Sequence, residues 1–340
     1  MGFPSIPART LGVVHPMRRL LLVFVLAFAG GLLAACGGPS QEGGGPPAFL
    51  SLGTAPPGGT FFVVGGAVGE VLDQAGHGAW TVTAEATSGS QENIRRLATG
   101  ELDLAVSNAS ITYFAVRGAE GWDRAYPVRS VMTLAQNVAM FVTPASTGIR
   151  RVADLRGRRV YVGPAGAGFE FFVKPIVEAH GLTYDDFTPI NGTQAAAVDM
   201  LADGAVAAAM LGGGVPTASI TQAAASQDIV LVAYDEDVKE KLVAQYPFFA
   251  AATIPANTYR GQIGDYEGLD VGSMHLITSA DADEDLVYRI TKAIYEHRED
   301  VAARHPAGRA INAANVVRET GTEFHPGAIR YYREIGIWPN

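Results

Sequence analysis

The chain has 340 residues, of which 48% are hydrophobic and 17% are charged, and its formal net charge is −9. This composition is typical of a folded protein with enough apolar residues for one large domain or two of medium size. Nucleic-acid binding depends on basic side chains that neutralise phosphates, so the acidic balance excludes a nucleic-acid partner.

Residues 1–35 have the pattern of a lipoprotein signal peptide. Arg18 and Arg19 precede an apolar run, 20–33, that is too short to span a bilayer comfortably. The run ends in Leu33-Ala34-Ala35-Cys36, which resembles the bacterial lipobox, so we predict lipidation of Cys36, the only cysteine. The alternative is a plain signal peptide with an incidental cysteine. Translation from Met17 instead of Met1 is a further hypothesis, because Met17 directly precedes the two arginines.

Cleavage before Cys36 would remove three arginines and no acidic residue, which changes the formal charge from −9 to −12. Residues 36–47 are rich in glycine and proline and predict a flexible tether behind the lipid anchor. We therefore expect an exported protein, either lipid-anchored at the outer face of the cytoplasmic membrane or in the periplasm.

Strand and helix patterns alternate from residue 48 onward. Ser90 is expected to cap the second helix, and the C-terminal helix carries an apolar stripe typical of core packing. The predicted strands are 48–53, 80–86, 102–107, 131–134, 139–143, 159–163, 205–211 and 229–233. The first predicted helix begins near residue 59, and the others span 90–97, 152–155, 168–180, 194–202 and 283–303. This alternation favours mostly parallel sheets covered by helices.

Motifs of common enzymes are absent from the sequence. There is no Walker A motif, no Gly-x-Ser-x-Gly elbow and no His-Glu-x-x-His, and the seven histidines are scattered. We therefore predict a protein that is not an enzyme, with no catalytic residues, no metal site and no cofactor.

Three loops lead from a predicted strand into a predicted helix and offer backbone N–H groups and small hydroxyls. They are residues 53–62, 87–93 and 163–169. Ligands of open α/β sheets bind at the carboxyl ends of the strands, and helix N-termini favour anions. The loops thus indicate an anion site, although well-capped turns that bind nothing would have the same sequences.

At these loops the chain resembles the TAXI-type solute receptors of tripartite ATP-independent periplasmic (TRAP) transporters, over residues 50–334. The resemblance rests on the order and spacing of several short segments. These are 53–60, 87–93 with 97–103, 154–160, 181–186, 214–217, 254–259 and 325–328.

The resemblance implies a type II periplasmic-binding-protein fold, with two α/β lobes, a ligand cleft and a two-strand hinge. Lobe one would combine 48–143 with 254–340, and lobe two would be 144–253. The chain would cross between the lobes near 141–146 and return near 250–255.

The resemblance also implies a function: capture of a small organic carboxylate and its delivery to a TRAP-type multi-span membrane permease. Known family members bind glutamate-like amino acids or 2-oxo dicarboxylates. The residues carried over as ligand-binding are Thr54, Gly59, Thr60, Phe61, Ser90, Asn93, Ser107, Asn108, Gly166, Ala167, Gly168, Phe169, Gly214 and Pro216.

This chain departs from the family pattern in two of its loops. Apolar residues stand at 55–57, 61–62, 167 and 169, where the family usually has hydroxyl-bearing side chains. We therefore expect a carboxylate with an apolar body to be preferred over glutamate, unless the phenylalanines only pack beneath the loops. A ligand-sensing receptor and a periplasmic enzyme on the same fold are the rival interpretations.

Overall fold

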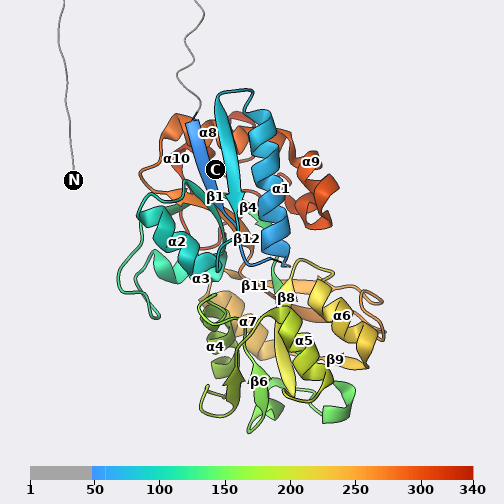
Figure 1. Cartoon of the computed structure of the whole chain (residues 1–340). Coiled ribbons are helices and arrows are strands. Elements are labelled where there is room, and N and C mark those ends of the chain that lie inside the picture. The colour runs from blue at the N-terminus through green and yellow to red at the C-terminus, as the bar shows by residue number, and fades with distance from the viewer. Residues whose placement is uncertain (1–47, 58, 340) are drawn as a thin grey trace, which may run out of the picture. The chain divides into compact units, whose positions relative to one another are not determined.

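Two β-sheets and the helices packed on them make up the part of the chain that the computed structural model describes, residues 48–57 and 59–339 (Figure 1). Both sheets belong to one compact unit, residues 46–340. The predicted signal peptide, Cys36 and the tether lie outside the described residues. Of the helices that are described, none is long and apolar enough to cross a membrane.

The first sheet has five strands in the order β2-β1-β3-β12-β4, and we call it and its helices lobe one. β1 pairs in parallel with β2 and β3, whereas β12 is antiparallel to β3 and β4. The strands are β1 (Ala48–Gly53), β2 (Trp80–Glu85), β3 (Leu104–Asn108), β4 (Val128–Ala135) and β12 (Met274–Ser279). The helices are α1 (Thr60–Ala75), α2 (Ser90–Ala98), α3 (Ala109–Ala115), α8 (Glu284–Glu296), α9 (Arg298–Arg304) and α10 (Pro326–Glu334), with a 3-10 turn at Pro306–Ala310.

The second sheet has the order β10-β11-β5-β8-β6-β7, with β9 paired to β5, and forms lobe two. β6 is parallel to β7 and β8, and the remaining pairs are antiparallel. The strands are β5 (Val138–Pro144), β6 (Arg159–Tyr161), β7 (Thr188–Ile190), β8 (Ala208–Gly213), β9 (Ile229–Leu231), β10 (Phe249–Ile254) and β11 (Tyr266–Val271). The helices are α4 (Glu170–Ala179), α5 (Gln194–Ala202), α6 (Ala218–Ser226) and α7 (Glu236–Gln245), with 3-10 turns at Ala145–Thr147 and Val152–Leu155.

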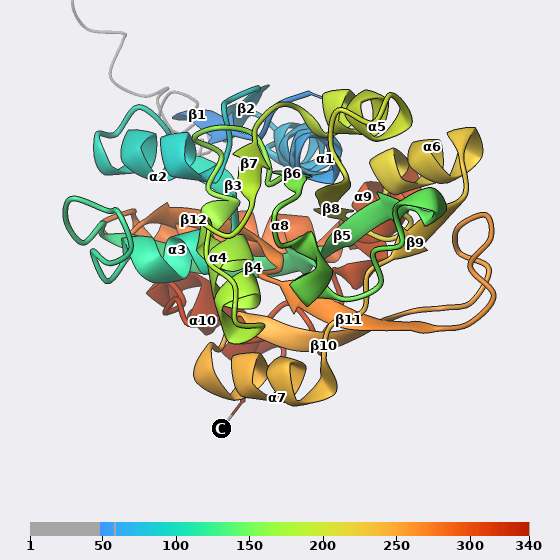
Figure 2. The same ribbon diagram turned by 90° about the horizontal axis from the view of Figure 1, so that it is seen from below.

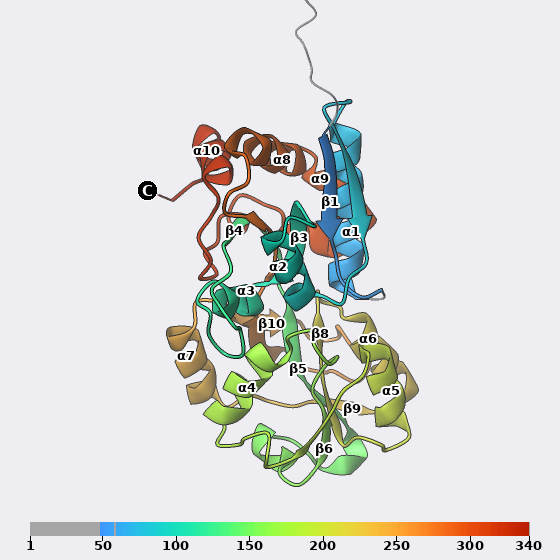
Figure 3. The same cartoon turned by 60° about the vertical axis from the view of Figure 1, so that its left-hand side comes forward.

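Helices cover both faces of each sheet. In lobe one, α1 contacts α8 and α9, while α2 lies against β3, β12 and β4 together with α3. In lobe two, α4 and α7 contact each other on one side of the sheet, and α5 and α6 contact each other on the other side (Figures 2 and 3). The alternating sequence pattern predicts this cover of helices. Its prediction of mostly parallel sheets is wrong, because four strand pairs are parallel and six are antiparallel. The antiparallel pairs all involve β5, β11 or β12, the strands next to the crossings between the lobes.

Helix α1 shows how the sequence fixes the packing that positions the site. Its apolar residues Val64, Val68, Val71 and Leu72 recur at helical spacing and are buried against the sheet. Gly69 faces β2, where a Cβ atom would lie only 2.8 Å from Ala84. The glycine therefore lets α1 approach the sheet closely, which sets the position of its N-terminus at the end of β1.

The chain crosses between the lobes at places other than those predicted. β4 lies in the first sheet and β5 in the second, so the first crossing is residues 136–137, and β11 and β12 place the second crossing at residues 272–273. Sheet membership thus assigns 48–136 and 273–339 to lobe one and 137–272 to lobe two, instead of 48–143 with 254–340 and 144–253. The physical reason is that β4 and β5 are both buried apolar strands separated by two residues, so no change in pattern marks the boundary.

The predicted helix 283–303 is divided into α8 and α9. The break falls at His297, which ends α8 with φ −100° and ψ 22°. The apolar stripe continues across the break because Ile294 and Val301 both pack in the lobe-one core. Periodicity alone therefore could not reveal it.

A buried histidine, His275, links β12 to α3 and β3 within lobe one, close to the second crossing. His275 on β12 is fully buried, and its Nε2 lies 2.8 Å from Thr112 Oγ1, which in turn lies 2.8 Å from Ser107 Oγ. Its Nδ1 has no hydrogen-bond partner among the described residues. Burial lowers the pKa of His275 to about 3, and the nearby Arg318 acts in the same direction. The ring is therefore neutral in the folded protein at every ordinary pH.

We predict that this histidine makes the protein less stable in acid. The unfolded chain binds a proton at His275 below about pH 6.5, whereas the folded chain does not until about pH 3, so the free energy of unfolding falls across that window by up to about 1.4 kcal/mol per pH unit. Urea unfolding at pH 7.5 and pH 5 should show a smaller fall in His275→Gln than in the wild type. The exposed-site variant His297→Gln serves as the control. Equal falls in wild type and His275→Gln would contradict the assignment.

Candidate functional site

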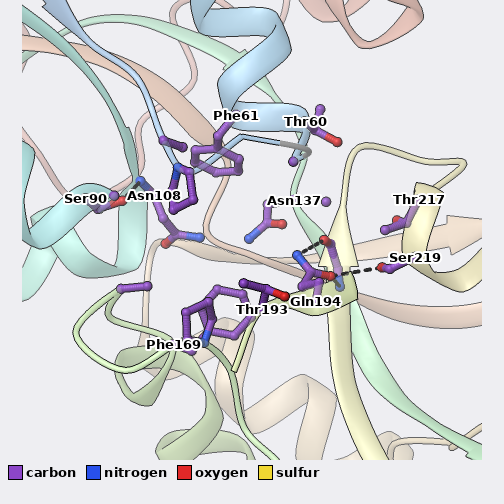
Figure 4. A pocket seen from close by; sticks show the side chains of 18 of the residues that line it. Thr60, Phe61, Ser90, Asn108, Asn137, Phe169, Thr193, Gln194, Thr217 and Ser219 are labelled. Carbon is purple, nitrogen blue, oxygen red and sulfur yellow. Dashed lines mark hydrogen bonds between the residues drawn. The ribbon is translucent and has the colours of Figure 1, made fainter. Parts of the chain in front are cut away.

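A cavity of about 370 Å³ lies between the two lobes (Figure 4). Lobe one contributes the loops that follow β1, β2 and β3, and lobe two contributes those that follow β6, β7 and β8. Asn137, on the first crossing, completes the lining. The cavity therefore lies at the carboxyl ends of strands of both sheets, which is where open α/β sheets bind ligands.

The structure brings about half of the predicted ligand residues to the cavity. Those in its lining are Gly59, Thr60, Phe61, Ser90, Asn108, Ala167 and Phe169. Those outside the lining are Thr54, Asn93, Ser107, Gly166, Gly168, Gly214 and Pro216. Contact of any of them with a ligand stays a prediction.

Two of the outlying residues, Thr54 and Asn93, are buried supports beneath the loops. Thr54 Oγ1 donates to the carbonyl of Glu85 at 2.7 Å. The amide of Asn93 donates to the carbonyls of Thr54 at 2.7 Å and Val106 at 2.8 Å, and so joins the loop after β1 to the middle of β3. The donor groups of both side chains are thus used to hold the loops in place, although Asn93 Oδ1 has no partner among the described residues. The sequence does not distinguish this role from ligand binding.

Ser90 and Asn108 line the cavity from neighbouring loops. Ser90 was expected to cap α2, but the residue at the cap is Gly89, and the Ser90 hydroxyl oxygen accepts the Asn108 N–H at 2.9 Å. Asn108 caps α3 through the N–H of Ser110 at 2.8 Å, and its amide donates to the carbonyl of Gly272 at 2.8 Å. Both side chains are therefore fixed before any ligand arrives.

The lobe-two wall contains the polar residues Thr193, Gln194 and Ser219, which are not among the predicted ligand residues. The side chain of Gln194 binds both the N–H and the carbonyl of Gly212, at 3.1 Å each, and accepts the hydroxyl of Ser219 at 3.0 Å (Figure 4). Thr193 caps α5 through the N–H of Ala196. The helix 194–202 was predicted, but the three-residue strand β7 before it was not. Recognition of β7 would have shown a further strand-to-helix loop.

The electrostatic character of the cavity is neutral but favourable to anions. Among the described residues that line it, none carries a charge. The N-terminal ends of α1, α2, α5 and α6 all contribute to the lining, and the first N–H groups of a helix have no partner within the helix. A small anion there would meet backbone donors and the positive ends of helix dipoles.

Much of the remaining surface of the cavity is apolar. Phe61 and Phe169 lie half-buried in its lining, together with the buried Ile111 and Phe172. The ring of Phe169 lies 5.0 Å from that of Phe172, measured between centroids. Phe61 and Phe169 are both drawn facing into the cavity from opposite lobes in Figure 4. An apolar ligand group would thus find ring surface on two sides.

The two lobes touch each other at both sides of the cavity. The N–H of Gly214 donates to Thr60 Oγ1 at 3.2 Å, and the amide of Gln91 donates to the Glu170 carboxylate at 3.0 Å. Behind the cavity, the rings of Phe114 on α3 and Phe171 on α4 stack at 5.6 Å between centroids. These contacts describe a closed arrangement of the lobes.

Comparison with known proteins agrees with this architecture. The profile of a family described as the NMT1-like family matches residues 52–336. The alkanesulfonate-binding protein SsuA from Xanthomonas axonopodis pv. citri, solved bound to MOPS, is similar with a TM-score of 0.51 and 16% identity over 86% of this chain and 92% of that one. A protein from Bordetella bronchiseptica is similar with a TM-score of 0.51 and 14% identity over 88% and 91% of the two chains. The predicted fold, two α/β lobes of periplasmic-binding-protein type, is confirmed.

We predict that Asn93 contributes to stability by joining the loop after β1 to strand β3. Asn93→Ala would remove the buried hydrogen bonds to the carbonyls of Thr54 and Val106, of which Thr54 keeps only the Thr87 hydroxyl at 3.2 Å, and this loss costs about 1–3 kcal/mol in the free energy of unfolding. Urea unfolding measures this loss. The exposed-helix variant Gln74→Ala, which removes an amide with one exposed partner, should change stability far less. An Asn93→Ala variant as stable as the wild type would contradict the supporting role.

Proposed function

The chain belongs to the NMT1-like family, and on that basis we propose that it is an extracytoplasmic solute-binding receptor that captures a small organic anion between its lobes. The observation that carries the proposal is the cavity itself, which is lined by helix N-termini and apolar rings from both lobes. Such a site binds a ligand by enclosure and contains no arranged acid–base pair among its described residues. A ligand recovered unchanged after prolonged incubation would support binding over catalysis.

We further propose that the ligand is a monoanion with an apolar body. A carboxylate can be held by neutral N–H groups and hydroxyls, but each additional buried charge needs partners of its own. Glutamate would bring a second carboxylate and an ammonium group, and the described lining offers neither a basic nor an acidic side chain to pair with them. A monocarboxylate with a branched or aromatic body avoids both costs.

The partner that we propose is a TRAP-type membrane permease, and the subfamily is the TAXI type. Support comes from the ordered segments of the sequence, several of which form the cavity loops, such as 53–60 and 87–93. We also propose that lipidated Cys36 and residues 37–47 tether the receptor to the membrane. Co-purification of the protein with a multi-span permease encoded beside it would test the proposed partner.

A panel of ligands on the domain 48–340 tests the monoanion proposal. At equal concentration we expect branched and aromatic monocarboxylates to raise the melting temperature more than glutamate or 2-oxoglutarate do, because a ligand that binds more tightly adds more to stability. A ligand at one hundred times its Kd adds about 2.7 kcal/mol. Alkanesulfonates belong in the panel because the similar SsuA is named for them. Stabilisation by glutamate alone would contradict the proposal.

Substitution of Phe169, on the lobe-two wall, tests whether the ligand's apolar body contacts this ring. Phe169→Thr removes ring surface from the cavity, and the loss of about 1.5–3 kcal/mol of apolar burial should weaken a branched monocarboxylate about tenfold or more in isothermal titration. The control is Phe49→Thr, since Phe49 is 82% exposed and lies outside the lining. Unchanged affinity in Phe169→Thr would place the ligand's apolar body elsewhere in the cavity.

Closure around the ligand is a separate prediction. Two-lobed binding proteins close by rotation about a hinge, and the contacts Gly214–Thr60 and Gln91–Glu170 join the lobes in the closed arrangement. Small-angle scattering should therefore show a smaller radius of gyration with a saturating monocarboxylate than without it. Gln91→Ala should weaken this closure. The same radius in both states would contradict closure but leave binding intact.

A further inference from the structure

One polar side chain of the cavity has no assigned role, and it lies on the first crossing. Asn137 is only 7% exposed and belongs to the lining. Its side-chain amide has no hydrogen-bond partner among the residues that the structure describes, although its backbone is bonded on both sides. Figure 4 shows this amide between Asn108 and Gln194, facing the cavity. The amide atoms of Asn137 face the cavity, where water can pair with them, and a ligand that displaces this water without offering a partner leaves the amide unpaired at a cost in free energy.

The neighbouring amides differ from Asn137 in this respect. Asn108 uses its oxygen for the N–H of Ser110 and its nitrogen for the carbonyl of Gly272. Gln194 uses both of its ends on Gly212. These side chains shape the wall, whereas both ends of the Asn137 amide are available to a bound molecule.

The position of Asn137 is fixed from behind by the end of β11, next to the second crossing. Its N–H donates to the carboxylate of Asp270 at 3.2 Å, and its carbonyl accepts the N–H of Val271 at 2.9 Å. Asp270 is fully buried and also accepts the hydroxyl of Ser273 at 2.5 Å and the guanidinium of Arg318 at 2.9 Å. The amide is thus held at the junction of the two lobes by groups that do not involve its side chain.

We propose that Asn137 determines specificity by donating a hydrogen bond to a neutral oxygen of the ligand, that of a hydroxyl or carbonyl group, in addition to the anionic group held by the helix N-termini. The inference rests on the proposed function, since it takes the ligand to be a monoanion enclosed by the lobes. An uncharged amide matches a neutral oxygen because it adds no charge that would need a buried partner. A ligand that lacks this oxygen leaves the amide unpaired.

Three acids with one carbon skeleton test this assignment. They are 4-methylpentanoate, 2-hydroxy-4-methylpentanoate and 2-oxo-4-methylpentanoate, each a monoanion, titrated calorimetrically into the domain 48–340. We expect the wild type to bind the hydroxy or the oxo acid about ten- to hundredfold more tightly than the unsubstituted acid, as the loss of a partner for a buried polar group implies. The arm that binds more tightly identifies the oxygen as hydroxyl or carbonyl.

The variants then assign the gain to Asn137. Asn137→Ala should bring the hydroxy and oxo acids down to the affinity of the unsubstituted acid while leaving that acid's affinity within about twofold, because the backbone bonds of residue 137 do not depend on its side chain. Asn312→Ala, an exposed amide outside the lining, is the matched control. Thermal unfolding checks that the variants fold, and Asn137→Leu, which is similar in size and has no donor, replaces Asn137→Ala if the latter does not.

The outcomes separate this inference from the proposed function. If all three acids bind and Asn137→Ala or Asn137→Leu weakens them equally or not at all, the role of Asn137 is overturned while the receptor function stands. If none of the three binds the wild type, the proposed ligand class is overturned, and the role of Asn137 with it.

Discussion

The carboxylate of Asp270 lies where the two sheets meet, and the geometry of the cavity depends on how it is paired. It accepts hydrogen bonds from the first crossing through Asn137, from the second crossing through Ser273, and from Arg318 in the C-terminal part of lobe one. Burial raises the pKa of Asp270, and the guanidinium of Arg318 opposes that rise. A buried carboxylate needs such partners, so the same atoms that stabilise the charge also hold the two crossings side by side.

The cavity shows how a protein can favour an anion without presenting an opposite charge. The described lining contains backbone donors at four helix N-termini and several hydroxyls, but no basic side chain. Oriented dipoles stabilise one small negative charge and offer little to a second. The selectivity that we propose therefore follows from the number of charges on the ligand as much as from its shape.

Much of the fold could be predicted from the sequence, because the apolar pattern of strands and helices reflects burial. Strand 48–53 and helix 194–202 were placed within a residue of their observed bounds. The first crossing could not be placed, because residues 136–137 are a two-residue gap between two strands that are both largely buried. For the site, loop position identified Thr60 and Ser90, but Asn93 and Asn137 are indistinguishable as sequence. Only the tertiary contacts show that the first supports the loops and that the second faces the cavity.

Each crossing between the lobes is only two residues long, and this shortness restricts how the lobes can move. Residues 136–137 and 272–273 supply a handful of rotatable backbone bonds. Gly272 has φ 113°, and a Cβ there would lie 2.3 Å from Asn108 Oδ1, so this position requires glycine. Two short connections that lie side by side permit rotation of one lobe against the other about one axis and resist rotation about the other axes. Each closing movement of the lobes would then follow the same path and bring Thr60 back to Gly214 and Gln91 back to Glu170.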